Sequence, residues 1–165
     1  MTPTLIVLLA TGLLAGEKEA PARPKPAPFA ADEKALLDLL NEARKKEKLP
    51  PLKANATLHK VALLHSQNMA KQEKMAHHLD EKGVGDRTAA GGYDYRVVRE
   101  NLAAAEGEVD CPAPTPKEIH DKWMESKGHR ANLLDARVTE VGIAIVVSKK
   151  GTYYYTQVFA TPRNR

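Results

Sequence analysis

The fold is decided by the segment Trp123-Met124-Glu125-Ser126-Lys127-Gly128-His129-Arg130-Ala131-Asn132-Leu133-Leu134, which contains the only tryptophan of the chain and a His-Arg pair directly after a glycine. Trp123 is predicted to anchor the core. Gly128 is predicted to end a helix, because a residue with positive φ costs least at that position. His129 would then leave the helix end on a turn and face a polar site.

Length and composition indicate one ordinary globular domain. The chain has 165 residues, of which 28% are charged and 42% are hydrophobic. The net charge is +4, but lysine and arginine are interleaved with aspartate and glutamate. A basic stripe with interleaved aromatic residues is absent from the sequence, so we predict no nucleic-acid partner.

The N-terminal part of the chain differs from the rest. Residues 5–16 form an apolar run that is too short to span a bilayer, which takes roughly 20 residues. We predict a signal peptide or an N-terminal apolar anchor over residues 1–16, and a Pro- and Ala-rich linker over residues 17–28. The predicted domain covers residues 29–165. Its predicted location is outside the cell, in the periplasm or at the cell envelope, with membrane contact only through an uncleaved N-terminal segment.

The single cysteine is Cys111, which lies in a Pro-rich stretch. One cysteine cannot form an internal disulfide, so the domain must be stable without a covalent cross-link. We interpret Cys111 as a free loop thiol rather than a catalytic nucleophile.

Two helices are predicted in the first half of the domain. Asp32 is expected to cap a helix that ends at about Glu47, and Asn55 to cap a second helix over about 56–74. His65 falls on the apolar stripe of the second helix. We interpret it as a hydrogen-bonded core histidine rather than a ligand.

A capping box and several strands organise the second half. Thr115-Pro116-Lys117-Glu118 predicts the start of a helix that ends at about Lys127. Three segments are predicted to be strands: 96–103, 139–148 and 152–160. Both faces of the strand at 139–148 are apolar, so both should be covered. The predicted fold is therefore α+β, a three-layer α-β-α sandwich with a small central antiparallel sheet.

Five parts of the sequence occur in an order that resembles a known family: His65–Ala70, Met75–His77, Glu100–Ala103, Trp123–Leu134, and the closing pair Glu140–Ala144 with Tyr155–Phe159. The family is the CAP superfamily (cysteine-rich secretory proteins, antigen 5 and pathogenesis-related 1), in its bacterial SCP-domain form. The resemblance implies an α-β-α sandwich with a cleft that holds two histidines and two acidic residues. Function varies more than fold in this superfamily, so the resemblance constrains activity weakly.

The resemblance assigns site residues one by one. His77 matches the first family histidine, Glu100 matches the glutamate of the Glu-Asn-Leu segment, and His129 matches the Gly-His-Arg turn of bacterial members. Animal and plant members carry a second acid where this chain has Ser126. The nearest acid is Glu125, one residue earlier. The resemblance therefore leaves at most a triad of His77, Glu100 and His129.

Two interpretations of this triad stay open. Two imidazoles and a carboxylate can hold zinc and leave a position for water, which makes His77 and His129 candidate metal ligands. The other interpretation is a structural network in which His129 and Glu100 pin loops to the sheet. Ser126 is close to His129 in sequence, but it lacks the nucleophile elbow of a serine hydrolase.

Three functions follow from these observations. The first is a non-enzymatic, exported CAP-domain protein that binds an envelope protein, glycan or lipid. The second is a divalent-metal-dependent hydrolase of the peptidase type, with zinc as its cofactor. The third is lipid or sterol binding, which some eukaryotic members show.

Overall fold

The computed structural model describes residues 29–106 and 113–163 of the chain. The predictions for residues 1–16, residues 17–28 and Cys111 lie outside these ranges. Within them, no helix has the length and apolar character needed to cross a membrane.

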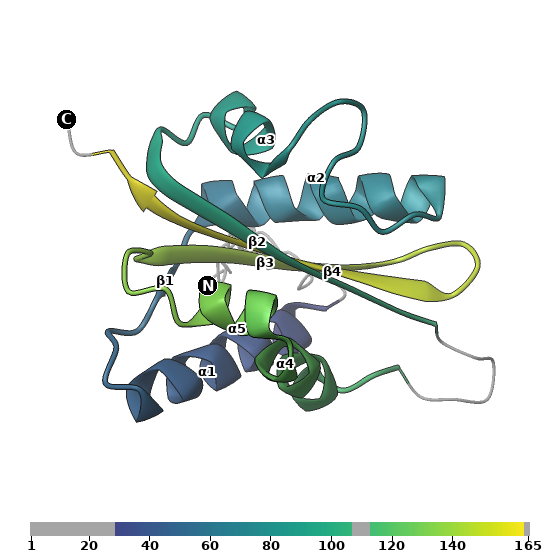
Figure 1. Ribbon diagram of the computed structural model, residues 1–165. Helices are drawn as coiled ribbons and strands as arrows, with labels where there is room; N and C mark the ends of the chain where they lie inside the picture. The colour runs from purple at the N-terminus through teal and green to yellow at the C-terminus, as the bar shows by residue number, and fades with distance from the viewer. Residues whose placement is uncertain (1–28, 107–112, 164–165) are drawn as a thin grey trace, which may run out of the picture.

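Residues 29–106 and 113–163 contain nine elements in three layers, with the sheet in the middle (Figure 1). In chain order they are α1 (Ala30–Lys46), β1 (Lys53–Ala54), α2 (Ala56–Gln72), α3 (Val84–Ala90), β2 (Tyr95–Glu106), α4 (Pro116–Glu125), α5 (Lys127–Leu133), β3 (Glu140–Val147) and β4 (Thr152–Pro162). Helices α2 and α3 cover one face of the sheet, and α1, α4 and α5 cover the other. The predicted α-β-α sandwich is confirmed.

The sheet has the strand order β1-β3-β4-β2. The three long strands pair antiparallel, as predicted, and Glu100 of β2 lies opposite Val158 of β4. The short strand β1 differs from the prediction, because it pairs parallel with β3 at Glu140 and Val141. Its two residues follow a pair of prolines and are too few to show an alternating pattern.

The two faces of β3 pack against different helices. Val141, Ile143 and Ile145 belong to the core on the side of α1 and α4, together with Trp123, which is 1% exposed. The indole Nε1 of Trp123 donates a hydrogen bond of 2.9 Å to the carbonyl of Leu102. On the other face, Ala144 is fully buried in a cluster with Leu58 and Val61 of α2. The predicted burial of both strand faces and of the tryptophan is therefore confirmed.

The predicted capping residues are confirmed for two helices and wrong for one. The side chain of Asn55 accepts hydrogen bonds from the backbone N–H groups at the start of α2, and Thr115 forms the predicted capping box with Glu118. Asp32 is not a cap, because α1 begins at Ala30 and the cap position is Phe29. The Asp32 carboxylate instead lies in the first helical turn, where it interacts favourably with the helix dipole.

The prediction for Gly128 is also wrong. Helix α4 ends at Glu125, two residues before the predicted end, and Ser126 is extended with φ −80° and ψ 118°. A new helix, α5, starts at once, because the carbonyl of Ser126 accepts the backbone N–H of Arg130 at 2.8 Å. Gly128 therefore lies in the first turn of α5, and His129 is a helical residue.

Arg44 is a core residue that the sequence did not reveal. It lies on α1 and is only 1% exposed. Its guanidinium donates hydrogen bonds to four backbone carbonyls, those of Pro50 at 2.9 Å, Leu133 at 2.9 Å, Asp135 at 3.1 Å and Val138 at 3.5 Å. It therefore ties α1 to the chain that follows α5.

Candidate functional site

Glu100 lies at the centre of a polar cluster on the outer strand β2. The residue is 6% exposed. Its Oε1 accepts a hydrogen bond of 2.9 Å from Nδ1 of His77, and its Oε2 accepts one of 2.5 Å from Nη2 of Arg87. Both carboxylate oxygens are therefore engaged by other side chains.

Arg87 belongs to α3, which packs beside β2 (Figure 1). Its Nη1 also donates to the carbonyls of His77 at 3.0 Å and Lys82 at 2.7 Å. The guanidinium therefore holds both the Glu100 carboxylate and the loop that carries His77. Sequence reasoning missed this residue, because an arginine in a short helix carries no pattern that distinguishes it from a surface arginine.

His65 lies beneath the cluster and is 1% exposed. Its Nε2 lies 3.0 Å from the carbonyl of Ala76, which accepts a hydrogen bond, and 4.0 Å from Oε2 of Glu100. Burial lowers the pKa of His65, and this favours the neutral ring. The predicted role as a hydrogen-bonded core histidine is confirmed.

His77 is the exposed member of the cluster, and its side chain is 54% accessible. The hydrogen bond to Glu100 raises the pKa of His77, with burial acting in the opposite direction. Since Nδ1 is held by the carboxylate, the ring presents Nε2 outward. Among the described residues, Nε2 has no hydrogen-bond partner.

Helix α5 brings His129 to the same edge of the sheet. The backbone carbonyl of His129 accepts a hydrogen bond of 3.1 Å from Asn101, and Asn132 donates to the carbonyl of Glu100 at 3.0 Å. Burial lowers the pKa of His129, and the nearby charge of His77 lowers it further. Asn101 and Asn132 therefore attach α5 to β2 beside Glu100 through backbone carbonyls. Within the described residues, His77 is hydrogen-bonded to Glu100, and the ring of His129 has no hydrogen bond to either residue.

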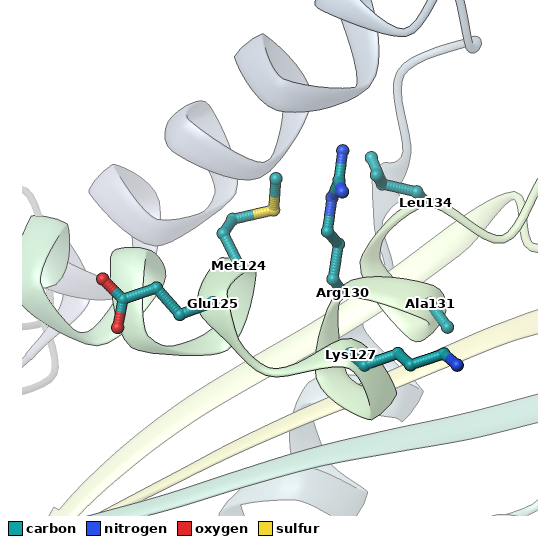
Figure 2. Close-up of a pocket in the computed structure, with 6 residues that line it drawn as sticks. All are labelled: Met124, Glu125, Lys127, Arg130, Ala131 and Leu134. Carbon is teal, nitrogen blue, oxygen red and sulfur yellow. The ribbon is translucent and has the colours of Figure 1, made fainter.

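The other two candidate residues lie elsewhere. Ser126 is the junction between α4 and α5. Glu125 lines a cavity of about 440 Å³ with Met124, Lys127, Arg130, Ala131 and Leu134. None of His77, Glu100 and His129 lines this cavity. Figure 2 shows the side chains of Glu125 and Lys127 pointing away from each other.

Arg130, at the edge of the same cavity, pairs with Glu47 just after α1 at 3.1 Å. This contact links α5 to α1. Like the hydrogen bonds of Asn132, it holds α5 against a neighbouring element.

The residues of the cluster do not fit a zinc set of His77, Glu100 and His129. In the part of the chain that the structure describes, no group of three or more His, Cys, Asp or Glu side chains is placed to hold a metal ion. The physical reason lies at Glu100, whose two oxygens already accept from His77 and from a guanidinium. A divalent cation at this carboxylate would also lie beside the fixed positive charge of Arg87.

The fold and the cluster together define an α-β-α sandwich protein with a histidine and glutamate cluster at the edge of its sheet. The chain belongs to the CAP family: the model of the cysteine-rich secretory protein family matches residues 37–159.

Two curated relatives come from Bacillus subtilis. The chain is 32% identical to the protein YkwD over 133 residues, which cover 80% of this chain and 49% of YkwD. It is 34% identical to the membrane protein YlbC over 128 residues, which cover 77% of this chain and 34% of YlbC. The chain therefore spans half or less of the length of these relatives.

Two solved structures share the fold. An extracellular protein containing an SCP domain from Bacillus anthracis is 28% identical, with a TM-score of 0.64 over 79% of this chain and 40% of that chain. An outer surface protein from Borrelia burgdorferi has a TM-score of 0.74 over 83% of this chain and 97% of its own, at 20% identity. The second likeness concerns the fold alone.

Proposed function

We propose that the chain is an exported CAP-domain protein that acts by binding, without catalysis, outside the cell or at the cell envelope. The proposal rests on the hydrogen bonds of the Glu100 carboxylate. Both of its oxygens are engaged, while the imidazole of His77 stays open to solvent. The cluster is therefore better suited to contact a ligand than to act as a general acid and general base in catalysis.

Hydrolysis would need a free carboxylate as a metal ligand or a general base. Glu100 is buried and paired with Arg87, and separating a buried ion pair leaves uncompensated charge. The cost of that separation favours binding over the alternative of a metal-dependent hydrolase.

The exposed side of the Glu100 cluster, formed by His77, favours a ligand that carries an acidic group. The pKa of His77 is raised, so its ring carries a proton more readily than a free histidine. A protonated imidazole donates from Nε2, and such charge-assisted hydrogen bonds favour carboxylates and phosphates. Envelope proteins, glycans and lipids all carry these groups.

Export is supported by the Bacillus anthracis relative, which is described as an extracellular protein. We expect the protein recovered from the culture medium or envelope to lack its first residues after cleavage of the predicted signal. Mass spectrometry of its N-terminal peptide checks this. A recovered protein that still begins at Met1 contradicts cleavage.

Binding can be tested by sedimenting the purified protein with envelope fragments from the source organism. We expect His77→Ala to bind about tenfold more weakly, because a lost charge-assisted hydrogen bond costs about 1.5–3 kcal/mol. The matched control is His78→Ala, which removes the adjacent exposed histidine and should bind like the wild type.

Three further arms identify the ligand class: protease-treated fragments, vesicles of the extracted lipids, and the purified glycan fraction. Loss of sedimentation after protease treatment indicates a protein ligand, and retention on vesicles or glycan indicates those ligands. Equal binding by both histidine variants, or no sedimentation of the wild type, contradicts the proposal.

A further inference from the structure

The outer edge of β3 is paired only in part. The short strand β1 ends opposite Val141, whose carbonyl accepts the backbone N–H of Asn55 at 3.0 Å. The backbone N–H of Ile145 points to the same side and donates to Oε1 of Glu33 at 3.2 Å. Since peptide groups alternate between the two sides of a strand, those of Ile143 also point outward. In the part of the chain that the structure describes, the outward N–H and C=O of Ile143 have no hydrogen-bond partner.

A cavity of about 510 Å³ lies at this gap in the pairing. Helices α1 and α2 cover opposite faces of the sheet, and the cavity lies between their first turns, beside β1 and β3 (Figure 1). Its volume is within the range of about 300–1,000 Å³ that is usual for ligand sites. The apolar side chains that line it are those of Ala30, Leu37, Ala54, Ala56, Val141 and Ile143.

The charged side chains at this cavity are engaged with one another. Oε2 of Glu33 lies 3.1 Å from Nε2 of His59, while its Oε1 accepts the N–H of Ile145. The ammonium group of Lys34 lies 2.5 Å from the carboxylate of Asp38. A charged ligand would have to compete with these contacts, so the cavity favours an uncharged ligand with apolar groups.

We propose that this cavity binds a short, extended peptide segment of a partner protein, which carries apolar side chains and adds to β3 in line with β1. Such a segment pairs with the outward N–H and C=O of Ile143 and places its side chains in the cavity, as in other cases of strand addition. Glu33 limits its length, because the carboxylate takes the place of the next strand carbonyl at Ile145. This goes beyond the proposed function, since Glu100 and His77 lie at the β2 edge of the sheet.

The probe is the blocked peptide acetyl-Gly-Val-Ala-Val-Gly-amide, titrated into the isotope-labelled full chain and followed by NMR. We expect the amide signal of Ile143 to shift and to saturate with a Kd of about 0.1–1 mM. Only alternate peptide groups of a bound strand face β3. Two versions of the probe, N-methylated at the alanine or at the valine that follows it, should therefore differ. One should bind at least about tenfold more weakly, and the other within about twofold of the unmethylated probe.

A side chain that fills the cavity should block the probe. Ala54→Trp fills it from β1 and should weaken binding at least about tenfold. The matched control is Lys53→Trp, which places the same side chain on the other exposed residue of β1, outside the lining of the cavity, and should bind like the wild type. If Ala54→Trp fails to fold, Ala30→Trp fills the cavity from α1 and replaces it.

Four results would overturn the proposal. The first two are the absence of a saturable shift at Ile143 and equal losses for the two N-methylated probes. The third is an equal effect of Ala54→Trp and Lys53→Trp. The fourth is another occupant: a mass increase in light scattering that Ala54→Trp abolishes indicates a second copy of the chain, and signals of residues 17–28 that shift with the probe indicate the predicted linker. Envelope binding is not measured here, so the outcome is independent of the proposed function.

Discussion

Replacing Arg44 by methionine is expected to lower the free energy of unfolding by about 3–5 kcal/mol, which would remove a large part of the stability of a domain of this size. The guanidinium is 1% exposed and donates to the carbonyls of Pro50, Leu133 and Asp135. Methionine has a similar volume but no donor, so it leaves these carbonyls without their partner. Urea unfolding followed by circular dichroism measures the loss.

The control for this substitution is the next residue along α1. Lys45 is exposed, so Lys45→Met should change the free energy of unfolding by no more than about 0.5 kcal/mol. If both variants unfold at the same urea concentration as the wild type, Arg44 does not hold α1 to the chain after α5.

Replacing Gly142 by alanine is expected to cost about 3 kcal/mol or more, or to prevent folding. A Cβ at this position would lie 2.1 Å from the backbone nitrogen of His59 and 2.1 Å from the backbone carbon of Leu58. These atoms belong to α2, so the whole helix would have to move away from β3. Thermal unfolding should show a large drop in Tm.

The same substitution at Gly128 is expected to have the opposite effect on stability. A Cβ there meets nothing within 4 Å, and the residue lies within α5. Gly128→Ala should therefore stabilise the protein by up to about 1 kcal/mol, because alanine is the better helix former. Equal effects of the two substitutions would show that the close approach of α2 to β3 does not limit stability.

The fold could be predicted from the sequence because its determinants are local or periodic. Asn55 and Thr115 cap helices by hydrogen bonds to residues two or three positions along the chain. The strand at 139–148 is an almost continuous run of apolar residues, so its two apolar faces can be recognised from the sequence. Gly128 was wrongly predicted to end a helix, because the helix ends earlier, at Glu125, and a second helix starts after the extended residue Ser126. The preferences of the residues in this segment did not reveal the break between the two helices.

The site could be predicted only in part. His77, Glu100 and His129 were found through the family motifs, and the structure joins the first two by a hydrogen bond and places the backbone of His129 beside Asn101. Arg87 was not found, because its contacts with Glu100 and with the carbonyls of His77 and Lys82 join neighbouring elements and follow no helix or strand period. Arg44 was not found, because its partners Leu133 and Asp135 lie 89 and 91 residues away in the sequence.

The segment Trp123–Leu134 also protects the sheet from unwanted association. Strand β2 is an outer strand, and two of its carbonyls, those of Glu100 and Leu102, accept hydrogen bonds from the side chains of Asn132 and Trp123. Outer strands with free carbonyls are templates on which another chain can add a strand and begin to aggregate. By occupying these two acceptors, the helical segment hinders the addition of another strand along this part of β2, while the side chain of His77 stays exposed for binding.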